Sequence, residues 1–85
     1  MNLKKEKLKV IINSPDKLIW DGVATSVSSK NSAGPFDVLP EHANFITMIQ
    51  NEPIVVRFLD KEHVFTYKNS VLSVYNGIVT IYTEI

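Results

Sequence analysis

The stretch GPFDVLPEHANFITMI, residues 34–49, is the strongest indication of the fold in this sequence. It is too apolar for a solvent-exposed loop, and proline interrupts it too often for a helix. Residues 36–39 predict a short strand that ends at Pro40, because proline lacks the N–H of a strand ladder and keeps its predecessor extended. A polar corner, residues 41–44, precedes a second apolar strand over residues 45–49. We therefore predict two strands that meet at a Pro-x-His-Ala corner.

Other parts of the chain also show strand periodicity. Apolar side chains recur at every second position in runs rich in β-branched and aromatic residues, which suit a pleated, half-buried surface. These runs cover residues 8–12, 23–27, 54–59, 64–67, 71–75 and 78–82. Turn sequences separate them at residues 14–17, 21–22, 31–34, 51–53, 60–63, 69–70 and 76–77. Asn76-Gly77 is the strongest hairpin signal, because both residues tolerate positive φ. Short strands with turns about every ten residues predict an all-β sandwich or barrel, here one domain over residues 1–85.

Composition excludes several classes of function. Nine basic residues balance nine acidic ones, so the chain has no electrostatic attraction to nucleic acid or to an anionic membrane. The absence of cysteine excludes disulfides and thiolate metal sites. We find neither a signal peptide nor a window near the roughly 20 apolar residues of a membrane span. A role at a membrane would therefore need a partner that holds the protein there.

The N-terminal lysines allow two interpretations. Lysine occupies positions 4, 5, 7 and 9, and Glu6 is the only acid among them. The cluster could be a partner-binding arm. It could also be the solvated face of a first strand whose Leu8, Val10 and Ile12 turn inward.

No constellation of residues predicts catalysis or metal binding. The two histidines, His42 and His63, lie on different predicted turns, and no ligand pattern joins them. Ser28 and Ser29 lack the local signature of a nucleophile. The predicted turns also carry carboxylates, for which solvation is a simpler explanation than catalysis: Asp16, Asp21, Asp37, Glu41 and Glu52. We expect no catalytic residue, no cofactor and no metal.

The aromatic residues and His42 have structural explanations beside functional ones. Trp20 would plug the core or its rim next to an Asp21-Gly22 turn, or stack on a ligand. Three tyrosines, at positions 67, 75 and 82, could stack single-stranded bases, but few basic residues accompany them. The His42 ring can hydrogen-bond backbone groups that the corner leaves unpaired, or act as a titrating switch.

Four segments together resemble one known family. They are LKVIINSPD at 8–16, GPFDVLPEHA at 34–43 followed by FITMI at 45–49, FTYKNSVLSV at 65–74, and NGIVTI at 76–81. Their order and spacing resemble the N-terminal β-sandwich domain of the epsilon subunit of F-type ATP synthases. The resemblance covers nearly the whole chain. The sequence has Asp37, Glu41, Asn69 and Ser70 where the family often has glycine, and Asn44 where it often has proline.

The resemblance implies a flattened β-sandwich of about ten short strands, with two sheets packed face to face. It implies a non-catalytic subunit of the central stalk that couples the membrane rotor ring to the gamma subunit. It further implies a complex that synthesises ATP and translocates protons or sodium ions. The subunit would lie peripherally on the cytoplasmic face of the bacterial inner membrane.

The resemblance also implies partner contacts. The loop that faces the rotor ring matches Asn31, Ser32, Gly34 and Pro35. The corner and strand near gamma match His42, Phe45 and Thr47. Family members commonly continue into a pair of C-terminal helices that can inhibit ATP hydrolysis and in some cases bind ATP. This sequence ends at Ile85, where that pair would start. We therefore expect either a naturally short subunit or a shortened one.

Two other functions remain as alternatives. One is a free-standing β-sandwich module that binds an unrelated protein. The other is a small enzyme or nucleic-acid binder. A further observation favours a protein interface: apolar residues 36, 38, 39, 45 and 46 crowd one corner beyond what a small interior readily absorbs. Either some of them reach the surface as a patch, or all belong to the core.

Overall fold

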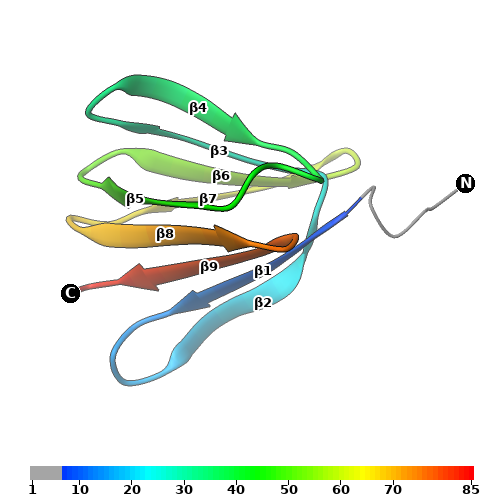
Figure 1. Ribbon diagram of the computed structural model, residues 1–85. Coiled ribbons are helices and arrows are strands. Elements are labelled where there is room, and N and C mark those ends of the chain that lie inside the picture. The colour runs from blue at the N-terminus through cyan, green and yellow to red at the C-terminus, as the bar shows by residue number, and fades with distance from the viewer. Residues whose placement is uncertain (1–6) are drawn as a thin grey trace, which may run out of the picture.

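The computed structural model describes residues 7–85, which form nine strands in two sheets (Figure 1). The strands are β1 (Leu8–Asn13), β2 (Leu18–Ala24), β3 (Ser26–Asn31), β4 (Gly34–Val38), β5 (Phe45–Ile49), β6 (Pro53–Phe58), β7 (Lys61–Thr66), β8 (Ser70–Tyr75) and β9 (Ile78–Thr83). One sheet has the order β2-β1-β9-β8-β5, and the other has the order β4-β3-β6-β7. The predicted all-β sandwich is confirmed, with nine described strands where about ten were expected.

Alternation along the strands supplies the core between the sheets. Leu8, Val10 and Ile12 of β1 are buried, as the sequence predicted, while Lys7 and Lys9 are exposed; Lys4 and Lys5 lie outside the described residues. The other buried apolar side chains are Ala24, Val27, Val38, Ile49, Ile54, Val56, Leu72, Val74, Val79 and Ile81. Each large one contributes about 1.5–3 kcal/mol by leaving water. This close-packed interior gives the domain its rigidity.

The chain changes sheets at Thr25, between β2 and β3. The Thr25 N–H and hydroxyl both donate to the Arg57 carbonyl, at 2.7 Å and 3.1 Å. The predictions of a turn at Asp21-Gly22 and of one strand over residues 23–27 are therefore wrong, because both turn residues lie inside β2. Gly22 serves packing: a Cβ there would lie 2.6 Å from the ring of Trp20.

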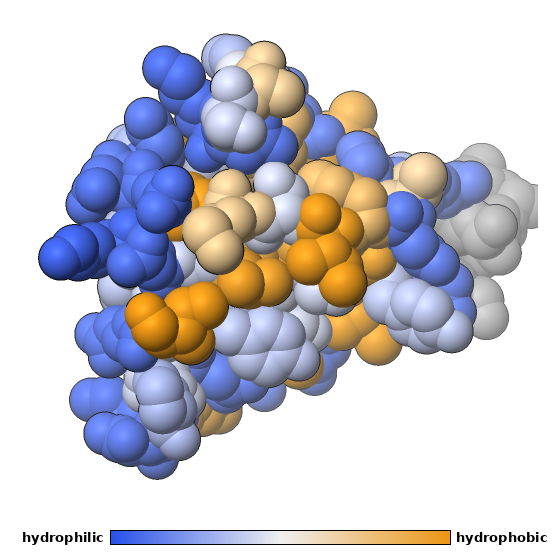
Figure 2. All heavy atoms as spheres, turned by 60° about the vertical axis from the view of Figure 1, so that its left-hand side comes forward, coloured by the Kyte–Doolittle hydropathy of each residue, from blue (hydrophilic) through white to orange (hydrophobic). Residues whose placement is uncertain are grey.

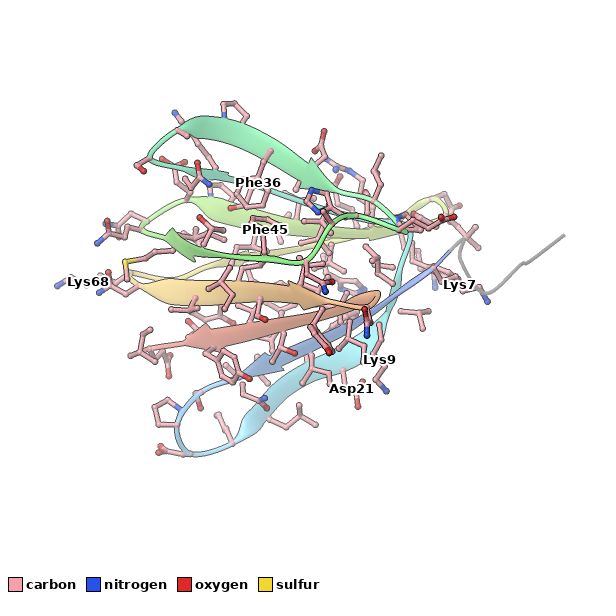
Figure 3. The ribbon with its side chains drawn as sticks, viewed as in Figure 1. Lys7, Lys9, Asp21, Phe36, Phe45 and Lys68 are labelled. Atoms are coloured by element: carbon pink, nitrogen blue, oxygen red, sulfur yellow. The ribbon has the colours of Figure 1, made fainter. Side chains whose placement is uncertain are left out.

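Aromatic side chains close both open sides of the sandwich. On one side, the Trp20 ring of β2 lies 5.4 Å from the His63 ring and 6.1 Å from the Phe65 ring of β7. On the other, Phe36 of β4 meets Phe45 of β5 edge to face, with centroids 5.8 Å apart (Figure 3). Trp20 thus plugs the rim, as one interpretation of the sequence had it.

Two hairpins show how well turns can be located from sequence. The predicted Asn76-Gly77 turn is confirmed, with φ of 48° and 78°. The turn predicted at residues 60–63 lies instead at residues 59–60, with Leu59 at a φ of 57°. Ser70, predicted in a turn, begins β8 and is fully buried.

Candidate partner-binding surfaces

Strand β5 presents apolar side chains to both sides of its sheet. Phe45, Thr47 and Ile49 face the interior, and Ile49 is fully buried there. Ile46 and Met48 point outward and are 72% and 52% exposed. The crowded corner is therefore divided: Val38 belongs to the core, Phe36 and Phe45 pack against it, and Leu39 and Ile46 reach the surface. Of the two open interpretations, the one with a surface patch is correct.

The outward side chains of β8 and β9 extend this surface. Met48 lies beside Val71, which pairs with Tyr82, while Tyr75 pairs with Ile78. We call the resulting surface the apolar face; it comprises Ile46, Met48, Val71, Tyr75, Ile78 and Tyr82. Hydrophobic side chains gather across the centre of the view in Figure 2, between hydrophilic margins. A surface of this kind on a small domain marks a binding site more often than scattered apolar residues do.

Charged residues border the apolar face and cover the opposite side of the sandwich. At the β1–β2 end of the five-stranded sheet, Lys9 and Asp21 form an ion pair at 3.5 Å (Figure 3). The four-stranded sheet carries a hydrogen-bonded chain on its outer surface: Ser28 donates to Asp37 at 2.5 Å, and Arg57 donates to Ser28 at 3.0 Å and to Glu62 at 2.9 Å. This network makes the outer surface of the four-stranded sheet the more polar of the two, although Val64 is exposed there.

His42 holds the corner between β4 and β5. Its backbone N–H donates to the Leu39 carbonyl at 3.0 Å, and its ring lies 4.9 Å from the Phe45 ring. Its Nδ1 lies 2.7 Å from the Ala43 carbonyl, which can only accept, so Nδ1 carries the proton. Glu41 has a φ of 69°, a conformation that glycine adopts freely. The predicted bonding of His42 to corner backbone is confirmed.

The corner is tied to the neighbouring β8–β9 turn. The side-chain oxygen of Asn44 accepts a hydrogen bond from the Asn76 N–H at 2.8 Å. His42 and both asparagines line an open hollow of about 600 Å³ between these two segments. Asn44 therefore supplies a side-chain contact that links the corner to this turn.

The β3–β4 loop projects from the opposite end of the strands (Figure 1). Asn31 shapes it: its side-chain oxygen accepts from the Ala33 N–H at 2.9 Å. Gly34 has a φ of 122°, and a Cβ there would meet nothing within 4 Å, so backbone conformation rather than space favours glycine. Ser32 and Pro35 are exposed. The loop offers small polar groups and little apolar surface.

One hydrogen bond links the two predicted groups of partner residues, although the corner at His42 and the β3–β4 loop lie at opposite ends of the strands (Figure 1). The Asn31 side-chain amide donates to the Thr47 hydroxyl at 2.9 Å, which joins the loop to β5. Sequence reasoning missed Met48, Tyr75, Ile78 and Tyr82. Their signal was present as apolar residues on both faces of residues 45–49 and 71–82, but alternation alone does not say which face is covered.

Residues 7–85 contain no group of three or more histidine, aspartate and glutamate side chains that could hold a metal ion. In that range no helix is long and apolar enough to cross a membrane. Burial, and then the charge of Glu84, raises the pKa of Tyr67 above the ordinary tyrosine value. Tyr67 stacks on Phe65 at the closed side of the sandwich, so this shift reflects packing.

Similar proteins agree with this geometry. The family model described as ATP synthase, Delta/Epsilon chain, beta-sandwich domain matches residues 7–85. An ATP synthase epsilon chain of Clostridium botulinum (strain Eklund 17B / Type B) is 31% identical over 80 residues, which cover 91% of this chain and 57% of that protein. The epsilon chain of the Alaska E43 / Type E3 strain is 30% identical over the same proportions. The chain thus spans a little over half the length of these curated relatives.

Solved structures show the same fold. A chain in the cryo-EM structure of the Euglena gracilis mitochondrial ATP synthase, OSCP/F1/c-ring, aligns with a TM-score of 0.84 at 16% identity, covering 92% of this chain and 51% of that one. A chain in the central stalk/c-ring structure of the Tetrahymena thermophila mitochondrial enzyme aligns with a TM-score of 0.73 at 14% identity, covering 89% and 62%. With a family model matched from residue 7 to residue 85, this chain belongs to the ATP synthase delta/epsilon chain β-sandwich family.

Proposed function

We propose that this protein is a non-catalytic central-stalk subunit of an F-type ATP synthase that couples the membrane rotor ring to the gamma subunit. Membership in the family supports the complex, and two structural relatives come from ATP synthase assemblies that include the c-ring. The complex would translocate protons or sodium ions. The subunit would lie peripherally on the cytoplasmic face of a bacterial inner membrane, held by its partners.

The apolar face is the observation that carries this proposal. Ile46, Tyr75 and Tyr82 are 72%, 63% and 47% exposed in the isolated chain, and they lie on one side of a continuous sheet. The three strands that carry the apolar face, spaced about 4.8 Å apart and with about five residues each at 3.3 Å, give a flat area of roughly 240 Å². Large apolar side chains that gather on one sheet face mark protein interfaces more often than scattered ones do. A subunit that is permanently docked would cover this surface.

The gamma subunit is the partner that we assign to the apolar face and its corner. The expected contact residues His42, Phe45 and Thr47 lie at the β5 edge of that face. Phe45 and Thr47 turn toward the interior, so their neighbours Ile46 and Met48 supply the outward contact. His42 and Phe45 would act chiefly by fixing the corner, through the hydrogen bond to Ala43 and the contact with Phe36.

The rotor ring is the partner that we assign to the β3–β4 loop. Asn31, Ser32, Gly34 and Pro35 form a small, polar, exposed surface that suits the polar loops of a ring rather than an apolar partner. The loop and the apolar face belong to one packed body, closed on both sides by aromatic contacts. Such a body transmits torque between two partners with little internal yielding.

Co-elution with gamma and with the rotor ring tests the assignment. The chain should elute with each partner separately and should hold both in one complex. Met48→Lys, which places a charge in the apolar face, should abolish elution with gamma, while Val64→Lys on the outer side of the four-stranded sheet should not. Ser32→Arg should weaken retention by the ring and leave gamma binding intact. Gamma binding that survives Met48→Lys would contradict the assigned surface.

A free-standing interaction module is the alternative function. The same apolar face would then bind an unrelated protein, and no cognate gamma subunit would compete for it. Gamma binding by the folded chain distinguishes the two, because a module with another partner would elute alone.

A further inference from the structure

One side-chain hydrogen bond joins the β3–β4 loop to the strand behind the apolar face. Asn31 ends β3 in the four-stranded sheet, and Thr47 is the central residue of β5 in the five-stranded sheet. The Asn31 Nδ2 donates to the Thr47 Oγ1 at 2.9 Å. The Ser28–Asp37 and Ser70–Thr83 hydrogen bonds, in contrast, each stay within one sheet.

Both polar atoms of the Asn31 side-chain amide form hydrogen bonds. Its oxygen accepts from the Ala33 N–H at 2.9 Å, and so shapes the loop, while its nitrogen attaches the loop to β5. Ser32 and Ala33 are exposed, so packing does little to hold the tip of the loop. The backbone ladder of β3 and β4 holds the loop up to the Asn31–Gly34 pair, and the Asn31 amide adds a link from there to the five-stranded sheet.

Thr47 sits between the two β5 residues of the apolar face. Ile46 and Met48 point outward from the positions on either side of it, and Thr47 points inward to Asn31. A partner that presses on Ile46 and Met48 restrains the backbone of β5 on both sides of the hydroxyl that holds the loop. Restraining the Thr47 hydroxyl favours the state in which the β3–β4 loop is hydrogen-bonded to β5 over the state in which that bond is broken.

We propose that Asn31 and Thr47 are positioning residues that couple the two docking surfaces, so that occupation of the apolar face orders the β3–β4 loop. The inference rests on the proposed function for the identity of the partners. Coupling of this kind is reciprocal: gamma on the apolar face raises the affinity of the loop for the ring, and the ring on the loop raises the affinity for gamma by the same factor. One net hydrogen bond sets the factor at roughly two- to tenfold.

Amide hydrogen exchange at Ala33, followed by NMR, tests the coupling. In the free chain, Thr47→Val removes the acceptor with little change in shape, and should speed exchange roughly two- to tenfold. In the wild type, saturating gamma should slow Ala33 exchange by a similar factor, and Thr47→Val should abolish that slowing. Thr66→Val is the matched control, because Thr66 is an exposed strand threonine on β7, away from both surfaces. It should behave as the wild type does.

The possible results separate the coupling from the proposed function. Failure of gamma to bind the wild type would remove the partner assignment, while faster exchange in free Thr47→Val would still establish the attachment of the loop. Gamma that binds without slowing Ala33 exchange, or that slows it equally in Thr47→Val, would overturn the coupling and leave the partner assignment standing. A merely structural role for Thr47 would change stability but not the response of the loop to gamma.

Discussion

Truncating Ile46 should weaken gamma binding while leaving the fold nearly unchanged. Its side chain is 72% exposed in the free domain. Full burial of such a side chain contributes about 1.5–3 kcal/mol, so docking onto the exposed part should contribute roughly 1–2 kcal/mol. Ile46→Ala should therefore raise the Kd for gamma roughly five- to thirtyfold. Because only a small part of the Ile46 side chain is buried in the free domain, Ile46→Ala should lower the free energy of unfolding by less than about 1 kcal/mol.

Two matched variants give this prediction its controls. Leu59→Ala removes an equally exposed apolar side chain, at 76%, from the β6–β7 turn outside the apolar face, and should leave the Kd unchanged. Ile49→Ala, in the same strand as Ile46 but only 1% exposed, should cost about 2–5 kcal/mol of unfolding free energy. Isothermal titration measures the Kd, and urea unfolding measures stability. An Ile46→Ala variant that binds within twofold of the wild type would refute the assigned surface, as would an equal loss in Leu59→Ala.

Three further predictions concern the packing that holds these surfaces in place. Gly22→Ala would set a Cβ 2.6 Å from the Trp20 ring, so it should lower stability by about 1–2 kcal/mol and shift the tryptophan emission seen during urea unfolding. Tyr67 has a raised pKa in the folded state, so the folded chain keeps this proton to higher pH than the unfolded chain. The contribution of the protonated Tyr67 side chain to the free energy of unfolding is complete below about pH 10 and is lost as the pH rises through the pKa of the folded state. Tyr67→Phe should remove this loss from the pH dependence of unfolding. Ser70 donates to Thr83 at 3.0 Å, both fully buried; Thr83→Val should cost about 1–3 kcal/mol, and adding Ser70→Ala should cost less than the sum of the single changes in a double-mutant cycle.

Local signals in the sequence predicted where the strands lie better than how the strands are arranged in the two sheets. Residues 45–49 and the Asn76-Gly77 turn could be located because proline ends the preceding strand, while asparagine and glycine tolerate the positive φ of the turn. Gly22 misled the prediction because its function depends on the Trp20 ring two residues earlier on the same side of β2. Nothing local to Thr25 indicates the change of sheet, which is set by its hydrogen bonds to Arg57 in a distant strand.

The candidate surfaces could be predicted only in part. The corner around His42 was predicted because Pro-x-His-Ala is a distinctive local pattern, and the ring does bond to the corner backbone. Ile46 and Ile49 are equally apolar, yet one is on the surface and the other in the core. Which side of a strand is covered depends on the second sheet, and this information is spread over the whole chain. The Asn31–Thr47 contact likewise joins residues sixteen positions apart and leaves no local pattern.

The most direct test of the proposed function is a calorimetric titration of this chain with its cognate gamma subunit. We expect a stoichiometric complex, with a negative heat-capacity change from burial of the apolar face. A cooperative unfolding transition shows that the chain is folded. If such a folded chain gives no binding heat at any temperature and does not co-elute with gamma, the stalk assignment is contradicted.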